Sequence, residues 1–303
     1  MNPPVDAVLC YLNGQFVPRE SAAIPVEDRG FIFGDGVYEV WRVVNGRLFE
    51  TERHLDRLAF GLGELRIETP EIAQIEVLTS VADRLLADSG LQDGEATLYL
   101  EVTRGVAPRT HQFPAKPPKP TVFVMANKFV PPNDVRLRGA AAITMNDIRW
   151  LRCDVKTIQL LPNVLAKQAA TERGAMEAIM IRDGIVTEGS HANVLGVIDG
   201  VIRTHPLNNL ILPGITRAIV LEIARSLGIP VREDALTAEE LSRLDECFLA
   251  GTTADVMPIV RIDDKMVGSG KPGPITTTLY REFRAHMDAA CGTAGASAAS
   301  SSH

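Results

Sequence analysis

Long apolar runs are missing from this sequence of 303 residues. No stretch approaches the roughly 20 consecutive apolar residues that a membrane-spanning helix needs. The start of the chain, from Met1 to Val8, also lacks the basic segment and the apolar stretch of a secretory signal. The sequence therefore predicts a cytoplasmic protein that does not associate with a membrane.

Paired cysteines and blocks of one charge are also absent. The four cysteines contain no CxxC pair, so the sequence indicates neither a disulfide framework nor a zinc site, and we expect no metal. The formal net charge is −7, and Lys and Arg form no block, which argues against nucleic acid or an anionic membrane as the main partner. Small molecules are the expected partners.

Hydrophobic residues make up 46% of the sequence, which is enough for one large core or two of ordinary size. The segment from Lys128 to Asn133 is the best boundary between two domains, because apolar density falls there and Pro131-Pro132 interrupts any regular element. The predicted division is an N-terminal small α/β domain at 1–130, an interdomain linker at 131–136, a C-terminal domain at 137–290 and a flexible tail at 291–303.

The N-terminal domain is predicted to open as an antiparallel sheet. Asn13-Gly14 and Asn45-Gly46 each lie between two apolar runs, the pattern of a β-hairpin turn. Between them, the stretch from Glu27 to Tyr38 carries three glycines. These glycines argue against a helix and indicate a backbone with unusual dihedral angles or one in close contact with another segment.

Two helices and two further strands are predicted in the same domain. Thr51 is predicted to cap a helix that ends near Leu65, and Thr69-Pro70 is predicted to begin a second helix that reaches about Leu85. Residues 95–103 alternate between apolar and polar, as a half-buried strand does. A loop at 104–120 then leads to a strand at 121–126.

The C-terminal domain is predicted to mix strands, hairpins and helices. Its strands are expected at 140–145, 246–250 and 257–262, and its hairpin turns at Asp183-Gly184 and Asp199-Gly200. Its helices are expected at 163–173, at about 212–227, after the capping box Thr237-Ala238-Glu239-Glu240, and at 274–287.

Lys156 is the first candidate for chemistry. A lysine that loses its proton easily is a nucleophile, and burial is the usual cause. Five of the seven lysines lie in loops, and Lys167 lies among polar residues of a predicted helix, so solvent exposure is expected for all six. Lys156 has apolar neighbours in the sequence. The composition of this segment supports two interpretations equally: a buried amine, or a lysine at the edge of the core that pairs with Asp154.

Three other signals are weak when each is taken alone. Gly214-Ile215-Thr216 opens a predicted helix, and the free N–H groups of a helix N-terminus favour an anion such as phosphate. Arg57 lies beside the apolar stripe of a predicted helix, and Arg109 and His111 share a loop. Each of these features also has a purely structural explanation.

In their order along the chain, seven motifs resemble the class IV pyridoxal-phosphate aminotransferases, and most closely the bacterial D-amino acid aminotransferases. The resemblance extends from about Tyr11 to Phe283, which is nearly the whole chain outside the tail. The motifs are EDRGFIFGDGVYEV, ERHLDRL, TRGVAPRTHQFP, DIRWLRCDVKTIQLLPNVLAKQ, TEGS, THPLNNLILPGITR and the Gly-Thr-Thr at 251–253.

This resemblance implies a two-domain fold of the α+β or α/β class, in which each domain is a mixed sheet with helices and pyridoxal 5'-phosphate lies at the domain interface. It implies that Lys156 forms a Schiff base with the cofactor aldehyde and later moves a proton between the substrate α-carbon and the cofactor. Glu188 would face the pyridine nitrogen and keep the ring protonated, so that the ring can accept electrons.

Further cofactor contacts implied by the resemblance involve the phosphate and the ring. Arg57 would pair with the phosphate. The N–H groups of Ile215 and Thr216 and the Thr252 hydroxyl would complete the phosphate site, and Leu212 would pack against the ring.

The resemblance also implies how a substrate is bound. In the D-amino acid enzymes, a tyrosine holds the substrate carboxylate together with an arginine and a histidine from a loop of the other subunit. Tyr38, Arg109 and His111 match these positions. The chain would then be a homodimer that moves amino groups from D-alanine-like donors to 2-oxoglutarate-like acceptors.

Two other functions stay open. A branched-chain L-amino acid aminotransferase or an aminodeoxychorismate lyase would share the lysine and the glutamate, but is not expected to carry the trio of Tyr38, Arg109 and His111. A non-catalytic homologue that binds the cofactor or a partner would be expected to lose that lysine or glutamate, and neither is lost. The chain departs from the D-enzyme pattern at His191-Ala192, where those enzymes continue with serines.

Overall fold

The computed structural model describes residues 8–292, which form two compact units. Of these residues, unit 1 comprises 8–130, Val155–Gln159 and 290–292, and unit 2 comprises Pro131–Asp154 and Leu160–Ala289. Val155–Gln159 therefore belongs to unit 1, although it lies within the C-terminal domain expected from the sequence. Most of the expected tail at 291–303 lies outside the described residues.

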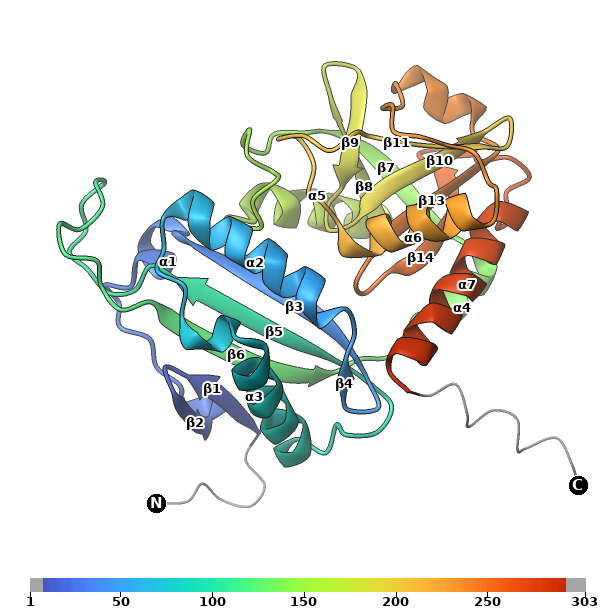
Figure 1. Cartoon of the computed structure of the whole chain (residues 1–303). Coiled ribbons are helices and arrows are strands. Elements are labelled where there is room, and N and C mark those ends of the chain that lie inside the picture. The colour runs from blue at the N-terminus through green and yellow to red at the C-terminus, as the bar shows by residue number, and fades with distance from the viewer. Residues whose placement is uncertain (1–7, 293–303) are drawn as a thin grey trace, which may run out of the picture. The chain divides into compact units, whose positions relative to one another are not determined.

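Unit 1 is built on a six-stranded antiparallel sheet with the strand order β2-β1-β6-β5-β3-β4 (Figure 1). Its strands are β1 (Leu9–Leu12), β2 (Gln15–Pro18), β3 (Gly36–Val44), β4 (Arg47–Leu48), β5 (Glu95–Thr103) and β6 (Thr121–Lys128). Both predicted hairpins are confirmed. Asn13 and Asn45 have φ angles of 50° and 46°, the left-handed values that an Asn-Gly hairpin turn uses.

Helices cover one face of this sheet (Figure 1). They are α2 (Thr51–Leu65) and α3 (Ile75–Asp88). Two short helices, η1 (Arg19–Ser21) and α1 (Arg29–Phe33), precede α2 in the chain, and a third, η2 (Glu71–Ala73), lies between α2 and α3. Thr51 begins α2 and does not cap it, because Glu50 takes the N-cap position. The single helix predicted from Pro70 is wrong, since Gln74 is extended and separates η2 from α3.

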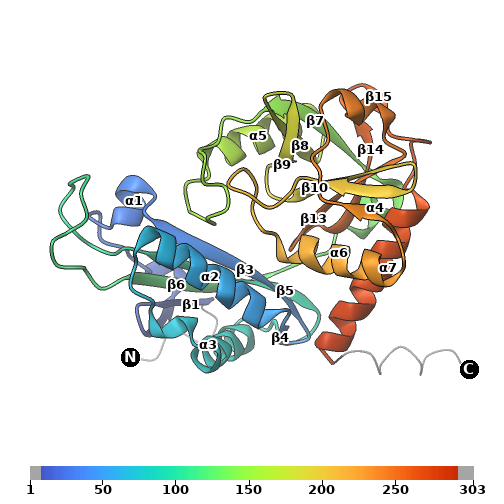
Figure 2. The same cartoon turned by 45° about the horizontal axis from the view of Figure 1, so that its top comes forward.

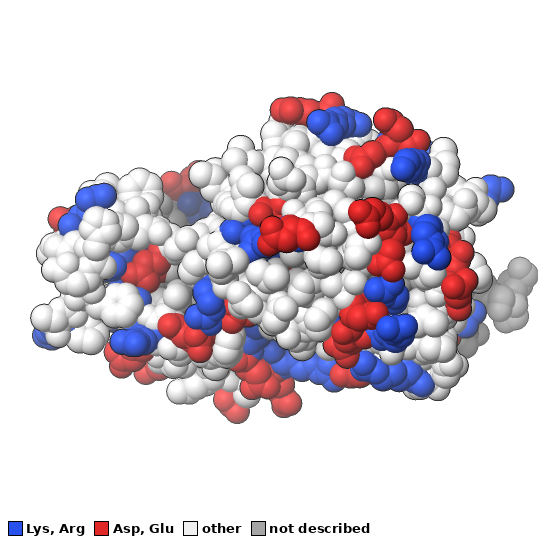
Figure 3. Space-filling model, turned by 90° about the horizontal axis from the view of Figure 1, so that it is seen from above, with Lys and Arg blue, Asp and Glu red and all other residues white. Residues whose placement is uncertain are grey.

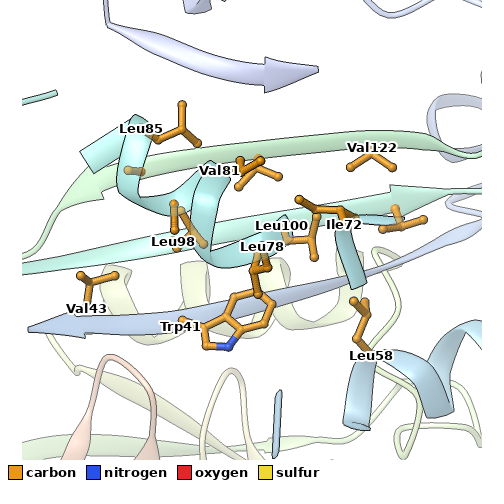
Figure 4. Close-up of a cluster of buried hydrophobic side chains, with 14 of the residues drawn as sticks. Trp41, Val43, Leu58, Ile72, Leu78, Val81, Leu85, Leu98, Leu100 and Val122 are labelled. Atoms are coloured by element: carbon orange, nitrogen blue, oxygen red, sulfur yellow. The ribbon is translucent and has the colours of Figure 1, made fainter. Parts of the chain in front are cut away.

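The core of unit 1 lies between the sheet and these helices. Trp41 of β3 and Leu98 and Leu100 of β5 are fully buried, and Figure 4 shows Leu78 of α3 close to Trp41 and Leu100. Burying a side chain of this size stabilises the fold by roughly 1.5–3 kcal/mol. Since successive residues of a strand point to opposite faces, the residues that alternate with these, such as Tyr99, lie on the other face of the sheet.

The glycine-rich stretch before β3 contains a short helix, so the prediction that it has no helix is wrong. Asp28 accepts a hydrogen bond from the N–H of Gly30 and caps α1, and Gly34 ends it with a φ of 67°. A single turn needs only these two caps, because most of its backbone groups lie at its ends.

Close contact with another segment, the other expectation for these glycines, is confirmed. Val155–Gln159 runs beside the start of β3, where Tyr38 N–H donates to the Lys156 carbonyl at 3.1 Å and Ile158 N–H donates to the Gly36 carbonyl at 3.1 Å. A Cβ on Gly36 would lie 2.7 Å from the Val102 carbonyl oxygen and 3.1 Å from Ile158 Cδ1. Only glycine fits this position without displacing a neighbour.

Unit 2 is built on a nine-stranded sheet with the order β12-β11-β10-β13-β14-β7-β8-β9, with β15 paired to β14. Pairing is parallel from β14 through β7 to β8 and between β11 and β12, and antiparallel elsewhere. Its strands are β7 (Ala140–Asn146), β8 (Glu177–Arg182), β9 (Ile185–Gly189), β10 (Asn193–Ile198), β11 (Val201–Thr204), β12 (Val231–Arg232), β13 (Glu246–Gly251), β14 (Asp255–Ile262) and β15 (Lys265–Met266). The sheets and helices of the two units confirm the prediction of two domains of the α+β or α/β class.

The helices of unit 2 are α4 (Asn133–Arg138), α5 (Leu161–Glu172), α6 (Ile215–Ser226), η3 (Glu239–Arg243) and α7 (Pro274–Ala290). Figure 2 shows α5 beside β7 and β8, and α6 beside β13. The predicted capping box is present, since Thr237 and Glu240 each accept the backbone N–H of the other, but it opens only the 3-10 helix η3. Lys167 is half-buried and donates to the Met176 carbonyl, so its predicted exposure is wrong.

The surface carries charged side chains of both signs. On the face in Figure 3, acidic and basic side chains lie next to one another in small groups. Within residues 8–292, no helix is long and apolar enough to cross a membrane. The four cysteines are buried and free, as the absence of a CxxC pair predicts.

Replacing Gly36 by alanine should destabilise unit 1 by about 1–3 kcal/mol, because the new Cβ has no room. Gly63→Ala is the control, since a Cβ there meets no atom within 4 Å and alanine suits a helix interior better than glycine by about 0.5–1 kcal/mol. Urea unfolding measures the free energy of unfolding of both variants. Equal effects of the two changes would show that the contact at Gly36 is not tight.

Candidate functional site

Lys156 is held in unit 1 beside the ring of Tyr38. Its Nζ lies 4.2 Å from the centroid of that ring, a cation–π distance, and its side chain is half-buried. Asp154 bonds to Arg152 at 2.9 and 3.0 Å, so the alternative in which Asp154 pairs with the lysine is wrong. No carboxylate among the described residues forms an ion pair with Lys156, which leaves its amine available for chemistry.

Arg57, the residue predicted to bind phosphate, is fixed by a carboxylate of β3. Its Nε and Nη2 donate to the two oxygens of Glu39 at 2.7 and 2.8 Å. Glu39 is fully buried and also contacts His54 Nδ1 at 2.7 Å. Burial raises the pKa of Glu39, but the charges of Arg57 and His54 outweigh it and hold that pKa well below its usual range. The guanidinium is thus held in one orientation.

The imidazole of His54 lies in the same cluster and responds to the same charges. Burial lowers the pKa of His54 below its ordinary value, Glu39 opposes that shift, and the charges of Arg57 and Lys156 reinforce it. Tyr38, whose ring lies beside the Lys156 amine, and Glu39, which holds the Arg57 guanidinium, are consecutive residues of β3. Sequence reasoning missed Glu39 and His54, although a lone carboxylate on the apolar face of a strand signals a buried partner.

Arg109 and His111 lie on the exposed loop after β5. Both contact Phe33 of α1, where Arg109 Cζ is 5.4 Å and the His111 ring 5.7 Å from its ring centroid. Arg29 donates to the Thr110 carbonyl between them at 2.7 Å. Within the described chain, neither Arg109 nor His111 contacts Tyr38, so the predicted substrate trio is not assembled by a single chain.

Glu188 lies near the end of β9 in unit 2, where three donors converge on its carboxylate. Arg149 Nη1 donates to Oε1, while Asn193 Nδ2 and the Leu212 N–H donate to Oε2 at 3.0 and 3.1 Å. An ionised carboxylate, which accepts at both oxygens, suits this set of donors better than a neutral acid does. Leu212, predicted to pack on a cofactor ring, is thereby linked directly to Glu188.

Arg149 is itself held by Asp147, and sequence reasoning missed both. Arg149 donates to the two oxygens of Asp147 at 2.9 and 2.8 Å and to the Leu210 carbonyl at 3.1 Å. Burial raises the pKa of Asp147, but the bonds from Arg149 and Thr187 lower it to about 2. Burial lowers the pKa of Arg149, whereas Asp147 and Glu188 raise it to a net value above the ordinary one.

The N-terminus of α6 lies a few residues after Leu212. Gly214 is its N-cap and no side chain caps the first N–H groups, while Ile215 and Thr216 are buried. A Cβ on Gly214 would collide with Asn193 Oδ1, so this helix start and the donor to Glu188 are packed against each other. Free N–H groups and the helix dipole both suit an anion here.

The departure at His191-Ala192 lies in the turn between β9 and β10. Ala192 is buried, and a Cβ on Gly251 would come within 3.2 Å of it, so this turn touches the one that carries Thr252. His191 Nδ1 lies 2.8 Å from Oε2 of the fully buried Glu177. Burial raises the pKa of Glu177, and His191 and Ser190 lower it to a net value below the ordinary one.

Within residues 8–292, no group of three or more His, Cys, Asp or Glu side chains could hold a metal ion. Of the site residues, Arg57 and Glu188 are each held by a partner of opposite charge. Unit 1 offers Lys156, Arg57 and Tyr38, and unit 2 offers Glu188 and the start of α6. An amine, an anion-binding helix start and a fixed carboxylate are what a phosphorylated cofactor with an aldehyde and a basic ring nitrogen requires.

The sequence is similar to those of known aminotransferases. Residues 36–262 match the family described as amino-transferase class IV. The chain is 41% identical over 278 residues to a D-alanine aminotransferase of Staphylococcus haemolyticus, in an alignment that covers 92% of this chain and 97% of that one.

Solved structures with a similar fold include those of branched-chain amino acid aminotransferases. The Escherichia coli enzyme has a TM-score of 0.84 at 25% identity, and the match covers 93% of this chain and 95% of that one. The Thermoproteus uzoniensis enzyme with norvaline has a TM-score of 0.81 at 28% identity, and the match covers 95% of this chain and 96% of that one.

Replacing Asp147 by asparagine should lower the free energy of unfolding by about 3 kcal/mol at pH 6, because it leaves Arg149 without its main buried carboxylate partner. Since the folded pKa of Asp147 is depressed to about 2, its stabilisation is complete above the ordinary value of 3.8 and is lost as the pH falls toward 2. The difference between the variant and the wild type should therefore shrink with acidification, as urea unfolding from pH 6 to pH 2.5 would measure.

Asp183→Asn is the matched control, since Asp183 lies exposed in a hairpin turn of the same unit. It should change stability by no more than about 0.5 kcal/mol at any pH. An Asp147→Asn effect that stays constant down to pH 2.5 would contradict the assigned ion pair.

Proposed function

Because this chain belongs to the class IV aminotransferases, we propose that it transfers the amino group of D-amino acids such as D-alanine to 2-oxo acids such as 2-oxoglutarate. The likeness to a D-alanine aminotransferase over almost the full length of both chains carries this proposal. Tyr38, Arg109 and His111, which match the carboxylate-binding residues of the D-enzymes, support it.

A branched-chain L-amino acid aminotransferase is the second candidate, favoured by the fold of the solved neighbours. Those neighbours share a smaller fraction of identical residues with this chain than the D-alanine enzyme does. We therefore rank it below the D-specific function.

We propose pyridoxal 5'-phosphate as the cofactor. The residues fit it, because Lys156 presents an amine without a carboxylate partner among the described residues, Glu188 an ionised acid, and α6 a start that no side chain caps. When bound, the cofactor supplies an aldehyde that carries the amino group and a ring that accepts the electrons released at the substrate α-carbon.

Lys156 would do two things in this reaction. Its amine anchors the cofactor through the aldehyde, and once released it holds and moves the proton at the substrate α-carbon. The Tyr38 ring, whose centroid lies 4.2 Å from Nζ, limits where the amine can go. The backbone bond from Tyr38 to Lys156 keeps these two groups together.

Glu188 would receive a protonated pyridine nitrogen. Its carboxylate is held by Asn193 and by the Leu212 N–H, so it need not reorganise when the ring binds. The positive charge of Arg149 would weaken the attraction for the ring if it stood alone. Asp147, which also pairs with Arg182, offsets that charge.

The phosphate would be bound by two kinds of group. Arg57 supplies a guanidinium whose direction is set by its two bonds to Glu39. Ile215 and Thr216 supply N–H groups at the start of α6, and the Thr252 hydroxyl adds a further donor. No proton transfer is required of these residues.

We further propose a homodimer in which Arg109 and His111 of one protomer serve the site of its partner. Their loop is exposed and does not reach Tyr38 of its own chain. The first turns of α5 also present Leu161, Val164 and Leu165 to solvent, at 69, 58 and 52% exposure. Residues at this spacing share one side of a helix, so they form an apolar stripe that a second copy could cover.

Lys156→Ala should lower the rate of pyruvate formation from D-alanine and 2-oxoglutarate by about 10⁴-fold or more, because the variant loses both the cofactor anchor and the group that carries the proton. It should also remove the visible absorbance band of the purified protein. Borohydride reduction followed by peptide mass spectrometry should find the cofactor on Lys156 in the wild type. Lys265→Ala, a change at an exposed lysine of β15, is the control. A band that survives in Lys156→Ala would exclude this lysine as the anchor.

Arg109→Ala should raise the KM for D-alanine by about 10- to 100-fold, because a charge-assisted bond to the substrate carboxylate is lost, while the bound-cofactor spectrum stays intact. Arg84→Ala, on the exposed side of α3, is the control.

Mixing the Arg109→Ala and Lys156→Ala chains then tests whether the residue acts across subunits. If it does, a hybrid dimer contains one intact site, and random exchange restores about a quarter of the wild-type activity. If Arg109 acts within its own chain, every site stays defective and mixing restores nothing.

A further inference from the structure

One face of the unit 1 sheet carries side chains that the cofactor site does not use. It is the face opposite the core, and strand register places Tyr38 beside Glu101 and Glu101 beside Phe123 on three neighbouring strands. One step along, the register places Val40 beside Tyr99 of the middle strand. The result is an aromatic and aliphatic surface with one carboxylate.

This surface begins at the reactive amine. Tyr38, whose ring lies 4.2 Å from Lys156 Nζ, has its ring centroid 5.7 Å from that of Tyr99. The Tyr99 ring is in turn 6.4 Å from that of Phe123. A substrate whose α-carbon is within reach of Lys156 can therefore extend its side chain over these rings.

Glu101 is an acidic residue without a basic partner among the described residues. Its Oε2 accepts the Tyr99 hydroxyl at 2.7 Å, and within residues 8–292 no Arg, Lys or His forms an ion pair with it. Burial raises the pKa of Glu101, the Tyr99 hydroxyl lowers it, and the buried Asp28 raises it further, to a net value above the ordinary one. Ionising a partly buried carboxylate without a cationic partner costs free energy, and a bound cation would offset that cost.

We propose that Tyr99 and Glu101 form the substrate side-chain subsite, and that this subsite selects D-amino acids with a cationic side chain, such as D-ornithine and D-lysine. This inference rests on the proposed function and specifies its substrate class. The methylene groups of such a side chain pack on the Tyr38 and Tyr99 rings, and its ammonium pairs with Glu101.

A simpler role for Glu101 is to accept the Tyr99 hydroxyl and nothing more. Glu101→Gln separates the two roles, because the amide oxygen still accepts that hydroxyl while the negative charge is lost. Glu76→Gln is the matched control. It removes the same charge from an exposed position on α3, which covers the opposite face of the sheet.

The test compares kcat/KM for D-ornithine and D-norvaline, which differ in the terminal amine. The wild type should favour D-ornithine, and Glu101→Gln should lower kcat/KM for D-ornithine by about ten-fold or more, mainly through KM, since a charge-assisted bond is lost. The value for D-norvaline should change little, and Glu76→Gln should behave as the wild type.

Binding without turnover gives a second readout. Titration calorimetry on the holoenzyme should show tighter binding of 5-aminopentanoate than of pentanoate, and Glu101→Gln should remove that difference. The subsite is refuted if the wild type has no preference for the amine in either measurement, if Glu101→Gln keeps the preference, or if Glu76→Gln also loses it.

Reaction with D-alanine separates this inference from the proposed function. If D-alanine is turned over but the preference for an amine is absent, the subsite alone is wrong. If neither D-alanine nor D-ornithine reacts, the proposed function has failed and the inference falls with it.

Discussion

The backbone pairing between Val155–Gln159 and the start of β3 is the constraint on which the arrangement of Lys156 and Tyr38 in unit 1 depends. It fixes the Lys156 carbonyl to the Tyr38 N–H and thereby sets the amine over the Tyr38 ring. Gly36 makes the pairing possible, because a side chain there would collide with β5 and with Ile158. The same strand carries Glu39, so one element positions the amine, the aromatic ring and the Arg57 guanidinium.

Arg57 and Glu188, which we assign to cofactor binding, are each oriented by a buried partner. Glu39 holds Arg57 in unit 1, and Asp147 holds Arg149, which in turn holds Glu188, in unit 2. Groups fixed before the ligand arrives lose little free energy to reorganisation when it binds. Glu101 differs from these two residues, since its partner is a neutral hydroxyl, and this difference is why we assign it to the substrate rather than to the scaffold.

Local patterns predicted much of the fold, because hairpin turns and alternating strands depend on neighbours in sequence. The turns at Asn13-Gly14 and Asn45-Gly46 and the strand at 95–103 are such cases. The pairs around the site were beyond prediction, since Arg149 and Glu188 are 39 residues apart and Arg57 and Glu39 are 18 apart. Lys156 itself was only an even choice on composition, and the family resemblance, not its surroundings, singled it out.

The central claim is that this chain transaminates D-amino acids through Lys156. Its most direct test is the visible spectrum of the purified, cofactor-loaded protein during titration first with D-alanine and then, in a separate sample, with L-alanine. D-alanine should bleach the visible band by converting the cofactor to its amine form, and 2-oxoglutarate should restore it, while L-alanine should leave the band unchanged. Bleaching by L-alanine alone would contradict the account and would favour an L-specific aminotransferase on the same fold.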